Sequence, residues 1–124
     1  MIMSSKAKIL YVDDERINLM LFQKIMEKKY DVITAESGEK GMDVLQEHRD
    51  IQTVISDMRM PGWSGLEFIR RVKEQFENKK CFILTGYSLN EELKAAIDSG
   101  LIIECWTKPA DFELIDQAII ANSK

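Results

Sequence analysis

The chain has 124 residues, of which 45% are hydrophobic, and its formal net charge of −4 corresponds to a sequence pI of about 5.1. This length lets one domain bury a core without disulfides or a structural metal. The acidic balance argues against a nucleic-acid surface, and the sequence has no run of ~20 apolar residues that could span a membrane. Residues 1–8 lack the apolar stretch of a signal peptide, so we expect a soluble, cytoplasmic protein.

Five short apolar runs predict β-strands, because they are about five residues long and rich in β-branched and aromatic residues. They cover residues 8–12, 31–35, 52–56, 81–85 and 102–106. The first, third and fourth runs are the most continuously apolar, as expected of central strands that are covered on both faces.

Amphipathic segments follow these runs and predict helices. In the first segment, the apolar residues at helical spacing that we expect to face the core are Ile17, Met20, Leu21 and Ile25. In the third, fourth and fifth segments they are Leu66, Ile69, Val72 and Phe76, then Leu93, Ala96 and Ile97, and finally Phe112, Ile115, Ala118 and Ile119.

Helix ends can also be placed from the sequence. Ser64, with Glu67 three residues later, is typical of a capping box. Asn90 or Ser88 could cap the fourth helix, and Gly100 could end it.

Five consecutive strand–helix units predict a parallel sheet with helices on both faces, in either the classic or the flavodoxin-like strand order. In both orders a ligand binds at the carboxyl ends of the strands. There the sequence places three acidic residues, a hydroxyl and an amine, namely Asp13, Asp14, Asp57, Thr85 and Lys108.

If the first and third strands are adjacent, the three carboxylates meet and repel one another. A hard cation with oxygen ligands relieves this repulsion, and few protein ligands with open positions favour Mg²⁺. A lysine and a hydroxyl facing such a centre favour phosphoryl transfer to a carboxylate nucleophile. Each residue alone has an ordinary interpretation, as a helix cap, a strand end or a surface charge. Their convergence at one edge favours the phosphoryl-transfer site.

Four segments together resemble the receiver domain of two-component response regulators, over essentially the whole chain. They are ILYVDDE at 9–15, DMRMPGWSG at 57–65, LTGY at 84–87 and KP at 108–109. The resemblance implies one domain, 1–124, with a core at about 7–122. It also implies an α/β fold, a flavodoxin-like doubly wound five-stranded parallel sheet of order 2-1-3-4-5 with helices on both faces.

The resemblance further implies roles for single residues. Asp57 accepts the phosphoryl group from a histidine kinase or phosphotransfer protein, Thr85 hydrogen-bonds that group, and Lys108 pairs with it. Asp14, Asp57 and the backbone carbonyl of Arg59 bind Mg²⁺ directly, and Asp13 acts through water. Lys108–Pro109 matches the family's cis peptide, and Gly86 leaves room for the phosphoryl group.

By the same resemblance the protein is a phosphorylated switch and not a conventional enzyme. Its output surface is formed by the fourth helix, fifth strand and fifth helix, which contact an output domain, a downstream protein or a second copy. Two alternatives are a magnesium-dependent phosphatase and a phosphorylation-independent binding module. No DNA-binding segment is expected within these residues, and the chain could come from a longer regulator or hybrid kinase.

Three features differ from the family pattern or modify it. Cys105 occupies the place of the family's switch aromatic, and the neighbouring Trp106, which points to the opposite face, is expected in the core. The resemblance implies that Arg59 and Tyr87 occupy positions that overhang the pocket, and we expect Tyr87 to restrict water. Trp63 either packs on the adjoining helix or contacts a partner.

The remaining candidates have ordinary interpretations. Cys81 and Cys105 form no C-x-x-C pattern and are expected to be buried free thiols. His48 is expected to be solvated. The residue pairs 70–71 and 79–80 are predicted at solvated helix ends, and core-filling roles are predicted for Met20, Met26, Met42 and Met60.

Overall fold

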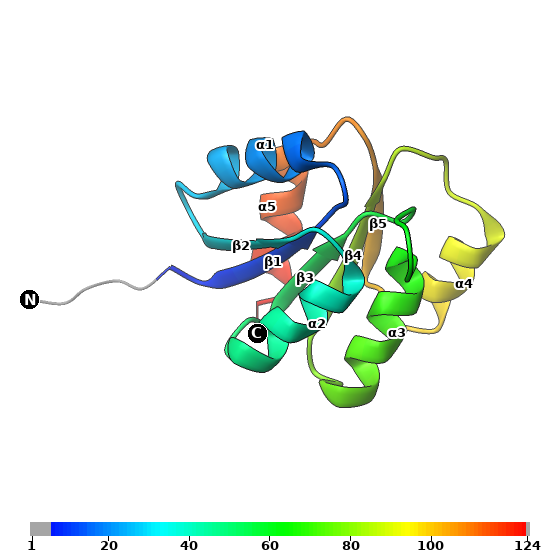
Figure 1. Cartoon of the computed structure of the whole chain (residues 1–124). Coiled ribbons are helices and arrows are strands. Elements are labelled where there is room, and N and C mark those ends of the chain that lie inside the picture. Colours follow the sequence, from blue (N-terminus) through cyan, green and yellow to red (C-terminus); the bar gives the residue numbers. More distant parts are fainter. Residues whose placement is uncertain (1–5, 124) are drawn as a thin grey trace, which may run out of the picture.

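The computed structural model describes residues 6–123, which form five strands and five helices in alternation (Figure 1). The strands are β1 (Lys8–Val12), β2 (Asp31–Ala35), β3 (Thr53–Ser56), β4 (Lys80–Thr85) and β5 (Glu104–Thr107). The helices are α1 (Arg16–Met26), α2 (Gly38–Glu47), α3 (Gly65–Gln75), α4 (Glu91–Asp98) and α5 (Phe112–Ala121). The five predicted strands are thus confirmed to within two residues at each end.

All five strands are parallel, and their order β2-β1-β3-β4-β5 confirms the predicted flavodoxin-like sheet. The central strands β1, β3 and β4 are buried almost throughout, whereas the edge strands β2 and β5 have exposed positions. Because Val12 at the end of β1 lies opposite Ser56 at the end of β3, the next residues of both strands emerge side by side. This register positions the candidate site.

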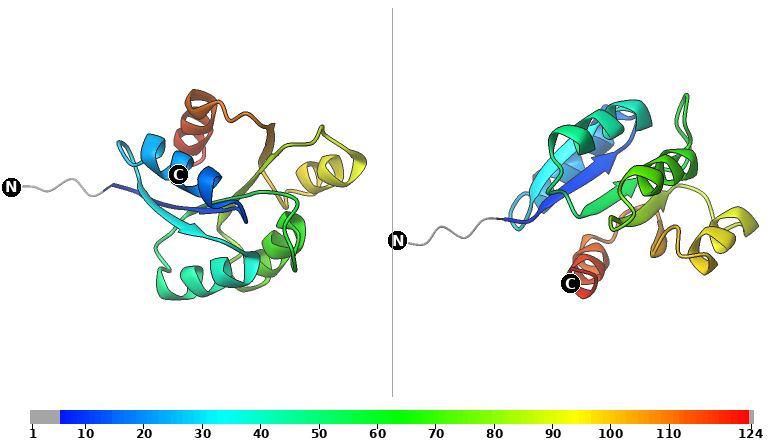
Figure 2. Two further views of the ribbon diagram at one scale, coloured as in Figure 1. Left: turned by 45° about the horizontal axis from the view of Figure 1, so that its top comes forward. Right: turned by 90° about the horizontal axis from the view of Figure 1, so that it is seen from below.

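The helices cover both faces of the sheet (Figure 2). On one face, α2, α3 and α4 bury side chains such as Leu45, Phe68 and Leu93. On the other face, α1 and α5 pack on the sheet through Phe22 and Ile115. Trp106 belongs to this second cluster and stacks on Phe82 with ring centroids 5.0 Å apart, which confirms its core position.

Helix α1 presents a different face to the sheet than predicted. The buried residues are Leu19, Phe22 and Met26. The residues assigned to the core are exposed instead, to 78% for Ile17, 63% for Met20, 52% for Leu21 and 39% for Ile25. The first half of this helix is apolar nearly all round, so its periodicity does not choose between two faces. The ring of Phe22 stacks on that of Tyr11 in β1, with centroids 4.2 Å apart, and this contact turns the face with Leu19, Phe22 and Met26 toward the sheet.

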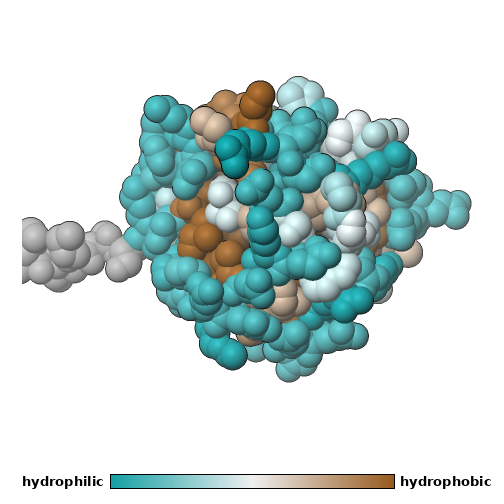
Figure 3. All heavy atoms as spheres, viewed as in Figure 1, coloured by the Kyte–Doolittle hydropathy of each residue, from teal (hydrophilic) through white to brown (hydrophobic). Residues whose placement is uncertain are grey.

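The exposed apolar residues of α1 gather on one surface, which we call the α1 face: Ile17, Met20, Leu21 and Ile25. In Figure 3 hydrophobic atoms are visible at the top of the molecule, over α1. The core prediction is thus wrong for Met20, whereas it is confirmed for Met26 and Met42, and Met60 packs partly buried against the core.

The predicted caps are confirmed with one change. The Ser64 hydroxyl accepts from the Glu67 amide at 3.1 Å, but the Glu67 carboxylate pairs with Arg71 and does not reach back to Ser64. Asn90 caps α4, and Gly100 follows this helix with a φ of +81°. Among the described residues, no helix is both long and apolar enough to cross a membrane.

Lys79 is buried, contrary to its predicted place at a solvated helix end, with only 6% of its surface exposed. Its amine donates to the carbonyls of Arg49 and Ile51, so the charge is solvated by the backbone in place of water. This contact joins the segment before β3 to the segment before β4, at the amino edge of the sheet.

Candidate functional site

Three carboxylates converge at the carboxyl edge of the sheet. Asp13 and Asp14 follow β1, and Asp57 follows β3, where its amide donates to the Val12 carbonyl at 2.8 Å. Each carboxylate offers one oxygen, and these oxygens lie within 4.8 Å of one another. Asp13 is fully buried, Asp57 is 7% exposed, and Asp14 faces solvent. The three carboxylates therefore converge as predicted, and the cluster is open to solvent on the side of Asp14.

Lys108 reaches this cluster from the end of β5. Its amine lies 3.0 Å from Asp13 Oδ2 and 3.3 Å from Asp57 Oδ2. The Lys108 amide donates to the Thr85 carbonyl at 2.6 Å, and the Lys108–Pro109 peptide is cis, as the resemblance implies. Burial alone lowers the pKa of Lys108. The hydrogen bond to Asp13 and the charges of Asp13 and Asp57 outweigh burial, so the net pKa is raised.

Asp13 is surrounded by donors, two of which the sequence interpretation missed. Its Oδ2 accepts from Tyr11 Oη at 2.6 Å, from Asn18 Nδ2 at 3.2 Å and from Lys108. Its Oδ1 accepts from the Glu15 amide at 2.9 Å. Tyr11 could have been found from strand alternation, because residues two apart on a strand point to the same face. The place of Asn18 depends on which face of α1 packs inward.

Asp57 carries a charge that its surroundings only partly compensate. Burial raises the pKa of its carboxyl, the Lys108 charge lowers it, and the Asp13 charge raises it again, for a net increase. Asp57 Oδ1 accepts from the Met58 amide at 2.8 Å. An extra cation at the open side of the cluster would relieve this excess of negative charge.

Gly65 lets α3 start directly against Asp57. A Cβ at this position would lie only 2.2 Å from the Asp57 carbonyl oxygen. Any residue other than glycine would therefore force the backbone to move. The Gly65 amide also donates to the Met58 carbonyl at 2.7 Å. The glycine that ends the DMRMPGWSG segment therefore holds the loop that carries Asp57.

Thr85 and the loop after β4 form another wall of the site. Thr85 is buried, and its hydroxyl accepts from the Tyr87 amide at 3.2 Å. The Tyr87 ring is 52% exposed and stacks with Arg59, whose guanidinium carbon lies 4.0 Å from the ring centroid. Gly86 faces open space, since a Cβ there would meet no heavy atom within 4 Å. The exposed Arg59–Tyr87 pair thus links the loops after β3 and β4.

The structure also shows the surroundings of Trp63, Cys81 and Cys105. Trp63 packs between α2 and α3, because its ring lies 3.1 Å from a Cβ built on Gly38 and the Arg71 guanidinium lies 4.4 Å from its centroid. This favours the packing interpretation of Trp63. Cys81 is a buried free thiol as predicted, whereas Cys105 is a free thiol that is only partly buried.

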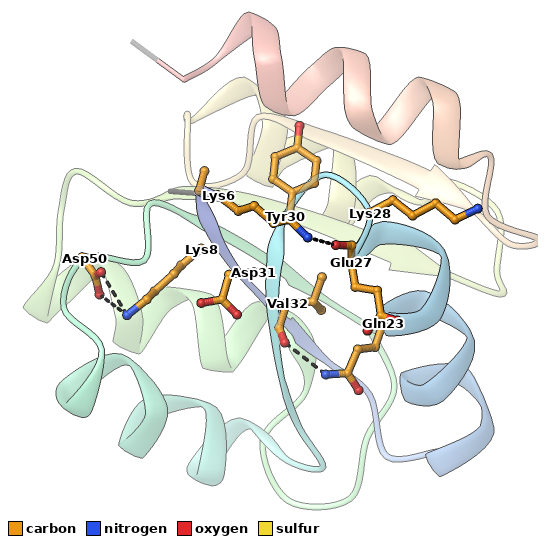
Figure 4. A pocket seen from close by; sticks show the side chains of 10 residues that line it. Lys6, Lys8, Gln23, Glu27, Lys28, Tyr30, Asp31, Val32 and Asp50 are labelled. Atoms are coloured by element: carbon orange, nitrogen blue, oxygen red, sulfur yellow. Dashed lines mark hydrogen bonds and ion pairs between the residues drawn. The ribbon is translucent and has the colours of Figure 1, made fainter. Parts of the chain in front are cut away.

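A large cavity, of about 940 Å³, lies at the amino edge of the sheet and is lined by none of the residues of the carboxyl edge (Figure 4). Two of its lysines already have partners: Lys6 donates to the Glu27 carbonyl at 2.6 Å, and Lys8 pairs with Asp50 at 3.1 Å. Size alone does not make it a site, and the carboxyl edge remains the candidate.

Comparison with known proteins identifies the class. Residues 9–120 match the family described as the response regulator receiver domain, and the chain belongs to this family. Sporulation initiation phosphotransferase F of Bacillus subtilis is 29% identical over 113 residues, which are 90% of each chain. The chain spans only 22% of the length of the hydrogenase transcriptional regulatory protein HoxA of Cupriavidus necator, to which it is 28% identical over 108 residues, or 86% of this chain.

Solved structures agree with this membership. The receiver domain protein from Clostridium thermocellum superposes with a TM-score of 0.87 at 31% identity, covering 94% of this chain and 93% of that one. The response regulator TrrA from Thermotoga maritima, solved in complex with Mg²⁺-BeF, gives a TM-score of 0.79 at 27% identity, covering 94% and 98%. The chain is therefore a two-component signalling domain with a flavodoxin-like fold.

Proposed function

We propose that this receiver domain accepts a phosphoryl group on Asp57 from a histidine kinase or phosphotransfer protein. One observation carries the proposal: the Asp57 carboxylate ends a central strand, within the acidic cluster, with the Lys108 amine 3.3 Å away. An Asp57 oxygen forms a bond to phosphorus while the phosphorus–nitrogen bond of the donor's phosphohistidine breaks. The electron pair of that bond stays on the imidazole nitrogen.

The residues at this edge fit Mg²⁺, which prefers oxygen ligands. Asp14, Asp57 and the Arg59 carbonyl would hold it directly. Asp13 would act through water, because it is fully buried and its Oδ2 already accepts from three side chains. When bound, the ion supplies positive charge to the phosphoryl oxygens. Lys108 pairs with the phosphoryl group once it is on Asp57, and the Thr85 hydroxyl hydrogen-bonds to it.

The α1 face is where we expect the phosphoryl donor to dock. It is apolar, exposed and on the helix that directly follows Asp13 and Asp14. Between α1 and the start of α5 lies a cavity of about 220 Å³, lined by Leu21, Lys108, Pro109 and Phe112 among others. Exposed apolar surface of this kind marks interaction sites. A donor seated there would also reach the open side of the cluster.

The signal would leave through the surface of α4, β5 and α5, toward an output domain, a downstream protein or a second copy. Cys105, on β5, packs against the cluster beneath α2, α3 and α4, whereas Trp106 packs under α5. The thiol therefore occupies the side that faces α4, and switching at this position proceeds without an aromatic ring.

The proposed function is tested by incubating the protein with acetyl phosphate and Mg²⁺ and measuring its intact mass. We expect one phosphoryl adduct on the wild type and none on the Asp57→Asn variant. No adduct on the wild type, or an equal adduct on the variant, would overturn the proposal.

A further inference from the structure

Asp13 is the most heavily hydrogen-bonded carboxylate among the described residues, although it is not the proposed acceptor. Three side chains donate to its Oδ2: Tyr11 at 2.6 Å, Lys108 at 3.0 Å and Asn18 at 3.2 Å. Asp13 is fully buried, so its charge depends on these donors in place of water. The shortest of the three contacts comes from a neutral phenol.

The Tyr11 hydroxyl is held rigidly. The residue is 1% exposed, and its ring stacks on Phe22 with centroids 4.2 Å and planes 18° apart. Burial, together with the hydrogen bond to Asp13, raises the pKa of the phenol far above its usual value, so Tyr11 remains a proton donor at physiological pH. The ring packing fixes the hydroxyl, and the hydroxyl fixes the carboxylate.

Lys108 divides its amine between Asp13 and Asp57. Pairing with a phosphoryl group on Asp57 weakens the hold of this amine on Asp13, so the buried carboxylate relies more on its remaining donors. We infer that Tyr11 is a positioning residue for phosphoryl acceptance, whose hydroxyl keeps Asp13 in place and solvated while Lys108 pairs with the phosphoryl group. This inference rests on the proposed function of Asp57.

The chain offers a matched control. Tyr30 is also buried, at 7% exposed, and its hydroxyl donates to Asp116 Oδ1 at 2.5 Å, away from the acidic cluster. Tyr11→Phe and Tyr30→Phe each remove one hydroxyl that donates to a carboxylate and keep the ring. If the Tyr11 hydroxyl contributed only to stability, both variants should form the phosphoryl adduct at the same rate.

The experiment measures two quantities on each folded variant. The first is the rate of adduct formation with acetyl phosphate and saturating Mg²⁺, in which an Asp57 oxygen bonds to phosphorus and acetate leaves with the electron pair. The second is the dissociation constant of Mg²⁺ alone, followed by tryptophan fluorescence. We expect Tyr11→Phe to form the same adduct about tenfold more slowly, in line with a lost hydrogen bond to a charged group. Its Mg²⁺ affinity should change less than about threefold, because the proposed direct ligands are retained.

Tyr30→Phe should leave both quantities unchanged. A Tyr11→Phe rate within twofold of the wild type would overturn the inference, as would equal slowing in both variants or a parallel loss of Mg²⁺ affinity. Should Tyr11→Phe fail to fold, Asn18→Ala removes the weaker donor to the same oxygen. It should slow adduct formation about threefold, and an unchanged rate would overturn the inference. Failure of the wild type to form an adduct would instead reject the proposed function.

Discussion

Each end of the sheet has a lysine with little exposure to water, partly buried Lys108 and buried Lys79, and their surroundings shift its pKa in opposite directions. At the carboxyl edge Lys108 lies between two carboxylates, and these partners raise its pKa despite burial. At the amino edge Lys79 donates to two backbone carbonyls and lies 5.1 Å from the centroid of the Phe76 ring. Burial there lowers the pKa of Lys79.

We expect this difference to separate a lysine that acts in phosphoryl acceptance from one that stabilises the fold. The partners of Lys108 are charged side chains on an open edge, and a phosphoryl group can compete with them for the amine. The partners of Lys79 are fixed backbone oxygens, which no ligand replaces. Lys108 should therefore matter for phosphoryl acceptance and Lys79 for stability.

The largest effect is expected for Lys108→Met. Loss of the amine should slow adduct formation with acetyl phosphate by about 100-fold, the usual effect of deleting one preorganised group that stabilises developing charge. Time-resolved intact-mass measurements at saturating Mg²⁺ would give the rate. A rate within tenfold of the wild type would make Lys108 a structural residue like Lys79.

Lys79→Met should have the converse effect. Removing the amine leaves the carbonyls of Arg49 and Ile51 without this donor, so the free energy of unfolding should fall by about 2 kcal/mol. The rate of adduct formation of the folded variant should be unchanged. Urea denaturation measures this free energy. Lys80→Met, at the first residue of β4, serves as the control and should lower the free energy of unfolding by less than about 0.5 kcal/mol. Slower adduct formation in Lys79→Met would contradict the comparison.

Asp57→Asn should stabilise the protein, because the carboxyl edge keeps an excess of negative charge. We expect a gain on the order of 1 kcal/mol, or roughly 4 °C in melting temperature. The pKa of Asp57 is raised above its ordinary 3.8, so the folded wild type binds more protons than the unfolded chain between these two values.

The wild type should consequently lose stability as pH rises through that window, whereas Asp57→Asn lacks this contribution. The stability difference between the two proteins should be largest above the raised pKa and should vanish below pH ~4. Thermal melts without Mg²⁺ across this range test the sign. A difference that grows on acidification would contradict the assigned charge balance.

The smallest effect is expected at Tyr87. The Arg59–Tyr87 pair lies over the loops beside Asp57, and Tyr87→Ala should expose the aspartyl phosphate to water. We expect dephosphorylation about threefold faster, as for the loss of a cation–π contact at an exposed site. The decay of the purified adduct measures this rate. An unchanged or slower decay would return Tyr87 to the role of a surface tyrosine.

The positions of the carboxylates could be predicted because the strands are continuous apolar runs and their ends fall on chemically distinctive residues. The predicted edge holds Asp13, Asp57, Thr85 and Lys108, and the cap at Ser64 could also be predicted from the sequence. These features depend on local sequence and on the geometry of parallel sheets. The assignment of roles to those residues stays a prediction.

The features that were missed depend on contacts between distant segments. Helix α1 has apolar residues on two sides, and only the stack of Phe22 on Tyr11 decides which side is buried. Lys79 resembles a solvated helix end until its two carbonyl partners are placed beside it. Tyr11 is an ordinary strand residue by pattern, and its hydroxyl gains a role only from its distance to Asp13.

The central claim is that Asp57, and no other carboxylate of the cluster, carries the phosphoryl group. Borohydride reduces an aspartyl phosphate to homoserine, which marks the modified residue permanently. After treatment with acetyl phosphate and Mg²⁺, reduction and peptide mapping should place homoserine at position 57 alone. Homoserine at position 13 or 14, or at none of the three, would contradict the account.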